Sequence, residues 1–113
     1  MLALTAAIRI YLYRAPCDMR KSFDGLCGLI RYELDADPLS GSLFVFINRR
    51  RNMIKSLYWD RDGFAIWFKR LEKGRFNLPD IANSDGRIDR LQLTLLLEGV
   101  VPKKVSKRYI FEK

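Results

Sequence analysis

The sequence places three consecutive arginines, Arg49, Arg50 and Arg51, between two apolar runs. The surrounding stretch, LFVFINRRRNMIKSLYWD (residues 43–60), predicts a tight hairpin, although such turns are usually built from Gly, Asn and Asp. Guanidinium groups at a hairpin tip suit contacts with phosphate, as in β-ribbon proteins that enter a DNA groove. We therefore predict phosphate contact by the three arginines, extended by Lys55 on the next strand. The alternative is a solvated, charged turn that keeps a sheet edge soluble.

A second basic cluster follows in KRLEKGR, residues 69–75. Gly74 in this motif would let the backbone approach a phosphate closely. The alternative is a local ion pair between an arginine and the glutamate of the motif, with the other cations solvated. The four cations predicted to contact nucleic acid here are Lys69, Arg70, Lys73 and Arg75, and the local ion pair would join Arg70 to Glu72.

Arg20 and Lys21 are the third candidate, because they lie in the first turn of a predicted helix. The N-terminus of a helix attracts anions, so two cations there oppose the helix dipole. A bound phosphate would reverse that effect, and so would a salt bridge with Asp18 or Asp24. Both interpretations remain open, and we include the two cations among the predicted nucleic-acid contacts.

Two tryptophans, Trp59 and Trp67, lie near lysines on predicted strands. With period-two alternation, Trp59 shares a face of its strand with Lys55, and Trp67 shares a face of the next strand with Lys69. Exposed aromatic residues among cations can stack on unpaired bases. The commoner alternative is that both tryptophans pack under the first helix.

Catalytic and metal chemistry receives little support. The absence of histidine excludes Ser–His and Cys–His catalysis. Cys17 and Cys27 are too far apart along the predicted helix to bond, and we expect reduced, partly buried thiols. The remaining candidates for a metal-dependent nuclease are five carboxylates, Asp18, Asp24, Asp60, Asp62 and Glu72. We predict no catalytic residue, no metal site and no cofactor.

The formal net charge of the chain is +8, which favours an anionic partner such as nucleic acid. The excess is local: residues 49–75 carry nine basic and three acidic residues, whereas residues 1–48 carry five of each. No apolar run reaches the roughly 18 residues that a membrane span needs. The first stretch, MLALTAAIRIYLY, lacks the early basic region of a signal peptide, so we expect a cytoplasmic protein without a membrane partner.

The elements that must position these residues indicate an α+β fold. Apolar spacing from Met19 predicts the main helix, with Asp18 as its N-cap. A shorter second helix is expected at about 89–98, ending at Gly99. The predicted strands are 7–13, 42–48, 53–59 and 64–71, with KRYIF near the C-terminus as a possible last strand.

We thus expect an antiparallel sheet of four to five strands with a central three-stranded meander. One main helix packs on this sheet, and the shorter C-terminal helix lies nearby. The length of 113 residues fits a single domain, residues 1–113, with an N-terminal tail at 1–7 and a basic C-terminal segment at 101–113.

Several motifs occur in an order and spacing that resemble one protein family. They are DMRKSFDGL (18–26), DPLSGSLFVFINRRRNMIKSLYWDRDGFAIWFKRLEKGRF (37–76) and LLLEGV (95–100). Together they resemble the TnpB accessory proteins of insertion-sequence-sixty-six bacterial transposons. The resemblance implies association with transposition and with the transposase of the same element. It does not extend to the RNA-guided nuclease that shares the TnpB name.

The favoured hypothesis is a non-enzymatic accessory protein that binds DNA, at transposon ends, through the basic hairpin and the basic loop. Charge alone would give salt-sensitive binding with little sequence preference. The second hypothesis is an adaptor that binds the transposase through the apolar stretch LQLTLLLEGV (91–100), without DNA contact. A metal-dependent nuclease is the third. The sequence does not indicate an oligomeric state.

Overall fold

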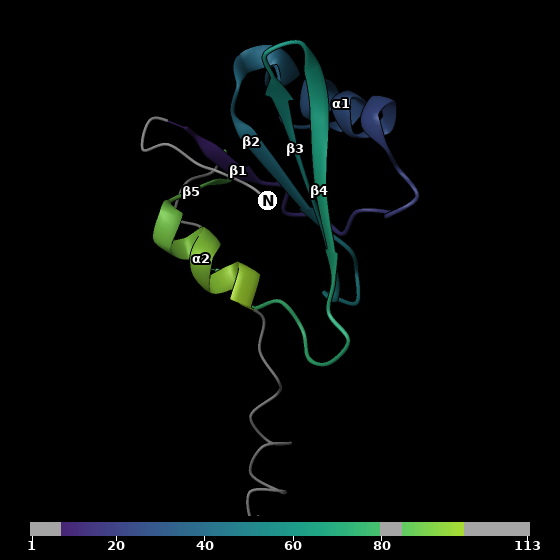
Figure 1. Cartoon of the computed structure of the whole chain (residues 1–113), viewed down its shortest axis with the longest axis vertical. Coiled ribbons are helices and arrows are strands. Elements are labelled where there is room, and N and C mark those ends of the chain that lie inside the picture. Colours follow the sequence, from purple (N-terminus) through teal and green to yellow (C-terminus); the bar gives the residue numbers. More distant parts are fainter. Residues whose placement is uncertain (1–7, 80–84, 99–113) are drawn as a thin grey trace, which may run out of the picture.

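A computed structural model describes residues 8–79 and 85–98 of the chain. Its centre is a five-stranded sheet with the strand order β4-β3-β2-β1-β5 (Figure 1). The strands are β1 (Ile10–Leu12), β2 (Leu43–Ile47), β3 (Met53–Asp60), β4 (Gly63–Arg70) and β5 (Arg87–Ile88). The strands β2, β3 and β4 form the predicted antiparallel meander. The expected α+β class is confirmed, and the sheet of five strands is mostly antiparallel.

One pair of strands, β1 and β2, runs in parallel, which the sequence interpretation did not foresee. A parallel pair needs a crossover connection, and here it contains α1 (Phe23–Tyr32) and the short 3-10 helix η1 (Pro38–Ser40). The carboxyl ends of β1 and β2 therefore lie at the same edge of the sheet. β5, on the other side of β1, is only two residues long and was also not predicted.

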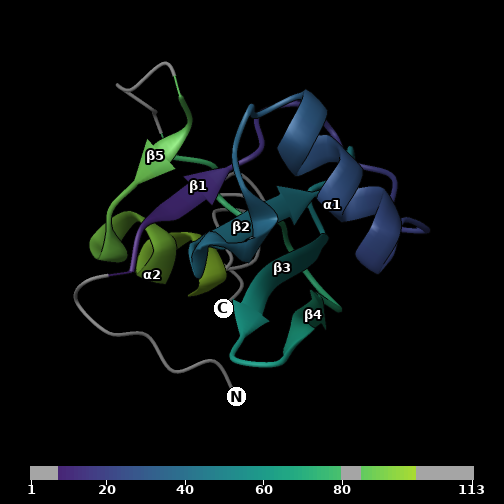
Figure 2. The ribbon, with the colours of Figure 1, turned by 90° about the horizontal axis from the view of Figure 1, so that it is seen from above.

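The two helices lie on opposite faces of the sheet (Figures 1 and 2). The alternation of β2 explains this arrangement, because all five of its residues are buried. Phe44 and Phe46 pack with α1, whereas Leu43, Val45 and Ile47 belong to the cluster that contains the buried leucines of α2 (Arg90–Glu98). A strand buried on both faces belongs inside a sheet, and β2 is the central strand of the five.

The start of α1 differs from the prediction. The helix begins at Phe23, with Ser22 at the N-cap, rather than at Met19 with Asp18 as its cap. The Asp18 carboxylate instead accepts the backbone N–H of Arg20 at 2.9 Å. This local bond stabilises a turn that competes with helical geometry, which explains the later start.

Other predictions are confirmed or lie outside the described residues. α2 agrees with the predicted second helix, and both cysteines, Cys17 and Cys27, are buried free thiols. Burial is the main cause that raises the pKa of both thiols. No helix within 8–79 or 85–98 is long and apolar enough to cross a membrane. The tail 1–7, the cap at Gly99, the KRYIF strand and the segment 101–113 lie outside the described residues.

Candidate nucleic-acid interface

Two asparagines, Asn48 and Asn52, build the turn between β2 and β3. The Asn48 side-chain oxygen accepts the backbone N–H groups of Asn52 at 3.0 Å and of Met53 at 2.9 Å. The Asn48 amide nitrogen donates to the Asn52 side-chain oxygen at 2.7 Å. The backbone N–H of Arg51 donates to the Asn48 carbonyl at 3.0 Å. Asparagine therefore supplies the turn chemistry that glycine supplies elsewhere.

The three arginines between these asparagines, Arg49, Arg50 and Arg51, are exposed. Arg51 has a φ of 60°, in the left-handed region that favours glycine. A side chain in this conformation costs about 1 kcal/mol. Glycine or asparagine would adopt this conformation at lower cost, so the geometry of the turn does not explain an arginine here.

Backbone hydrogen bonds hold the loop after β4 against this turn. The N–H of Leu71 donates to the Asn52 carbonyl at 2.8 Å, and the N–H of Phe76 donates to the Arg51 carbonyl at 2.7 Å. The Phe76 ring is 1% exposed and lies in the α2-side core, which anchors the loop. Between these two anchors, Lys73 and Arg75 are exposed.

The fold therefore joins the two basic clusters that are separate in the sequence. We call the joined area the basic turn surface. It comprises five exposed cations whose charged side chains form no hydrogen bond or ion pair with another described residue: Arg49, Arg50, Arg51, Lys73 and Arg75.

The two strand lysines that were predicted to contact nucleic acid form hydrogen bonds within the fold. The Lys55 Nζ donates to the carbonyls of Met19 and Lys21, both at 2.8 Å, and lies 5.1 Å from the centre of the Phe68 ring. The Lys69 Nζ donates to the Leu97 carbonyl at 3.2 Å. Lys55 thus holds the segment before α1 against the sheet, and Lys69 ties β4 to α2. Their contact with nucleic acid stays a prediction.

Two predicted arginine contacts have a carboxylate partner. Arg20 Nη2 lies 2.7 Å from Asp18 Oδ2, and Arg70 Nε lies 3.2 Å from Glu72 Oε2. The Arg20 guanidinium, by hydrogen bonding and charge, lowers the pKa of the Asp18 carboxyl to about 2. Both pairs are exposed, so they contribute little to stability. The salt-bridge interpretations of DMRK and KRLEKGR are thus realised, while phosphate contact by Arg20, Lys21 and Arg70 stays a prediction.

The tryptophans differ from the expectation in one respect. Trp59 packs edge-on against Phe64 on the α1 side, with ring centres 5.0 Å apart. Trp67 packs against the α2-side core, so the prediction that both lie under the first helix is wrong for Trp67. The reason is the register, because Trp67 pairs with Ser56 and therefore faces the side opposite to Leu57.

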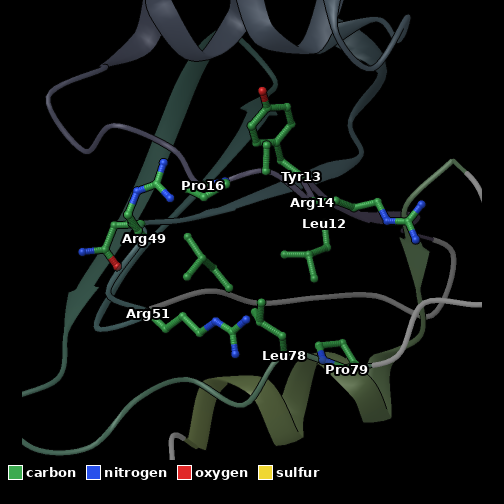
Figure 3. A pocket seen from close by; sticks show the side chains of 11 residues that line it. Leu12, Tyr13, Arg14, Pro16, Arg49, Arg51, Leu78 and Pro79 are labelled. Atoms are coloured by element: carbon green, nitrogen blue, oxygen red, sulfur yellow. The ribbon is translucent and has the colours of Figure 1, made fainter.

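A hollow of about 460 Å³ lies beside the basic turn surface, at the carboxyl ends of β1 and β2 (Figure 3). Arg49 and Arg51 line it, and so does Arg14, which lies two residues after the end of β1. Arg14 was missed by the sequence interpretation. Arg14 lies two residues after β1, as Arg49 lies two residues after β2. This correspondence points to a shared site only once the parallel pairing of β1 and β2 is known.

The five carboxylates considered as metal ligands do not gather in one place. All of them are described, and no three acidic, cysteine or histidine side chains within the described ranges are grouped to hold a metal ion. Asp60 and Asp62 flank the β3–β4 turn, whereas Asp18 is paired with Arg20.

Comparisons with known proteins complete the description of the site. The family model described as "IS66 Orf2 like protein" matches residues 8–107. Two relatives come from Sinorhizobium fredii (strain NBRC 101917 / NGR234), and both are named as uncharacterized. The protein y4jC is 30% identical over 96% of this chain and 92% of its own length. The protein y4hO is 33% identical over 82% of this chain and 81% of its own length. No solved structure shows a significant match.

Proposed function

Since the chain belongs to the family of IS66 Orf2-like proteins, which are accessory proteins of IS66 transposons, we propose that it assists the transposase by binding DNA at transposon ends, without catalysing a reaction itself. The basic turn surface is the proposed contact area. Phosphate contacts of Arg and Lys supply most of the affinity in such complexes, and they position a protein without reading the sequence.

The observation that carries this proposal is the seating of the 71–76 loop on the β2–β3 turn. Two backbone hydrogen bonds and the buried Phe76 ring fix five unpaired cations in one area. A solubility device needs dispersed charge rather than an anchored cluster of a single sign. A cluster of this kind raises the local concentration of a polyanion.

The salt dependence of binding tests this proposal directly. Fluorescence anisotropy with a labelled duplex, titrated at several salt concentrations, gives the slope of log K against log salt. Five phosphate contacts predict a slope of about −4.5, since each contact to B-DNA contributes about −0.9. A transposon-end duplex and a scrambled duplex are compared to detect sequence preference. A slope near zero, or no binding at low salt, would contradict the proposal.

A second candidate is supported by the outer face of α2. Leu91 and Leu95, one turn apart, are 66% and 52% exposed. An apolar pair on a helix surface suits a protein partner, and the transposase of the same element is the partner that the family suggests. In the adaptor hypothesis, Leu91→Glu with Leu95→Glu abolishes co-elution with the transposase. Charge reversal of Arg49, Arg50 and Arg51 leaves that co-elution intact.

A further inference from the structure

The hollow beside the basic turn surface lies where ligands bind in sheets that contain parallel strands. Its walls come from the carboxyl ends of the parallel pair β1 and β2, from the segments that follow them, and from Leu78 and Pro79 after β4 (Figure 3). Crevices outside the carboxyl ends of parallel strands are frequent ligand sites. The volume of about 460 Å³ falls within the roughly 300–1,000 Å³ of small-ligand pockets.

The lining combines two kinds of chemistry. Leu78, Pro16 and Pro79 present accessible apolar surface, and the buried side chains of Leu12 and Ile47 close the floor. Three arginines supply positive charge, and none of the described residues that line the hollow is acidic. A simple inorganic anion would leave the apolar surface uncovered, and a neutral apolar ligand would leave the guanidinium groups uncompensated. A ligand that suits both the apolar surface and the guanidinium groups has a planar, largely apolar part flanked by negatively charged groups.

The arginines are spread around the hollow rather than gathered at one point. In Figure 3, the Arg51 side chain runs toward Leu78, Arg49 lies on another side near Pro16, and Arg14 stands at the far end, with its guanidinium directed outward. This arrangement suits several phosphates along an extended strand better than a single phosphate. Arg49 and Arg51 also belong to the basic turn surface, so one DNA strand can continue from that surface into the hollow.

Tyr13 also lines the hollow, and its phenol is uncharged at neutral pH. Its pKa is raised, mainly by burial and also by the charges of Glu33 and Cys17, so the phenol stays protonated at neutral pH. A neutral phenol adds no charge that would repel a phosphate, and its ring is held by Phe46 at a distance of 5.5 Å between centres.

We propose that the hollow binds an unpaired nucleotide of a DNA strand, with the base against Leu78, Pro16 and Pro79 and the flanking phosphates at Arg14, Arg49 and Arg51. A base inside a duplex is stacked and paired, so it cannot enter such a space. The ligand is therefore a single-stranded end or a nucleotide displaced from a distorted duplex. This inference rests on the proposed function, since it assumes that the neighbouring surface binds DNA.

Binding of matched DNA ligands tests the inference. The ligands are a blunt duplex, the same duplex with a four-nucleotide overhang, and the same overhang made of abasic sites, which keeps the phosphates and removes the bases. We expect about tenfold tighter binding of the overhang than of the blunt duplex, because a base against the apolar lining removes apolar surface from water. The abasic overhang is expected to lose most of that preference. Equal affinity for the normal and abasic overhangs would overturn the inference.

Two variants separate the hollow from the basic turn surface. Ala15→Trp fills the hollow without a change of charge, and Arg14→Ala removes the cation at its far end. Both are expected to abolish the overhang preference while blunt-duplex affinity stays within about twofold, since phosphate contacts of the turn remain. Arg61→Ala, at the opposite end of β3, is the control for loss of one exposed arginine. Circular dichroism and thermal unfolding confirm that each variant folds.

A single-stranded tetranucleotide distinguishes the two proposals. Duplex binding without overhang preference would contradict nucleotide binding in the hollow and would leave the proposed function intact. Tetranucleotide binding that Ala15→Trp abolishes, without any duplex binding, supports the hollow and contradicts duplex binding by the turn. Absence of all three kinds of binding overturns both.

Discussion

The two hairpin turns at opposite ends of β3 share a residue with positive φ but differ in the charge of the neighbouring side chains. Each contains an arginine in the left-handed region, Arg51 with a φ of 60° and Arg61 with a φ of 55°. In the β3–β4 turn, Asp60 and Asp62 stand on either side of the arginine. In the β2–β3 turn, two further arginines precede it, and asparagines close the turn.

The difference shows which part of each turn serves the fold. A left-handed arginine alone is a feature of both turns, so it does not distinguish a binding surface. The β3–β4 turn surrounds its arginine with carboxylates, which would repel a phosphate backbone. The β2–β3 turn leaves its charge uncompensated and adds the cations of the seated loop. The charge around the turn, rather than its backbone, is therefore the candidate functional feature.

Charge reversal at the two turns should produce the largest contrast. The combined substitution of Arg49, Arg50 and Arg51 by Glu is expected to weaken duplex binding at low salt by about 10³-fold, since it replaces three phosphate contacts by repulsion. Arg61→Glu is expected to change the affinity less than about threefold. Fluorescence anisotropy measures both. An equal loss in the two variants would mean that binding follows net charge rather than this surface.

The contribution of the seated loop should be smaller and additive. Lys73→Ala with Arg75→Ala is expected to reduce the steepness of the salt dependence by about 1.8, from about −4.5 to about −2.7, because two contacts are lost. The measurement is the slope of log K against log salt for the same duplex. Arg61→Ala is the matched control and should leave the slope unchanged. An unchanged slope in the double variant would exclude the loop from the interface.

The asparagines should matter for stability more than the arginines do. Asn48→Ala removes the acceptor of two backbone N–H groups in a half-buried turn, so we expect a loss of about 1–2 kcal/mol in the free energy of unfolding. Asp62→Ala in the other turn is expected to cost less than about 0.5 kcal/mol, as is usual for exposed positions. Urea unfolding monitored by circular dichroism compares the two. A smaller loss for Asn48→Ala than for Asp62→Ala would contradict this interpretation of the turn.

Replacement of the left-handed arginines by glycine separates stability from binding. Arg51→Gly and Arg61→Gly both relieve the positive φ, so each should raise the free energy of unfolding by up to about 1 kcal/mol. Only Arg51→Gly is expected to weaken DNA binding, by severalfold, through loss of one phosphate contact. Unfolding curves and anisotropy of the same preparations provide the comparison. If Arg51→Gly bound DNA as tightly as the wild type, the Arg51 side chain would make no contact that contributes to binding.

The sequence predicted the local features of the two turns but not their surroundings. Apolar runs and helical spacing located β2, β3, β4 and α2, because each pattern reflects burial of the element itself. The hydrogen bond from Phe76 to Arg51 and the parallel pairing that brings Arg14 and Arg49 to the same hollow depend on contacts between distant segments. The internal bonds of Lys55 and Lys69 depend on the same kind of contact, and residue type alone does not reveal them.

Arg20 extends the comparison to a cation that, like Arg61, has a carboxylate neighbour. Its hydrogen bonds lower the pKa of the Asp18 carboxyl to about 2, below its ordinary value of 3.8. Because the folded-state pKa is depressed, the stabilisation is present above pH 4 and is lost as the pH falls toward 2. NMR titration of the Asp18 carboxyl should show this midpoint, and Arg20→Ala should return it toward the ordinary value. The same variant should barely change duplex affinity, since this cation is already neutralised by its partner. A marked loss of affinity in Arg20→Ala would instead show that DNA displaces Asp18, which would extend the interface to the start of α1.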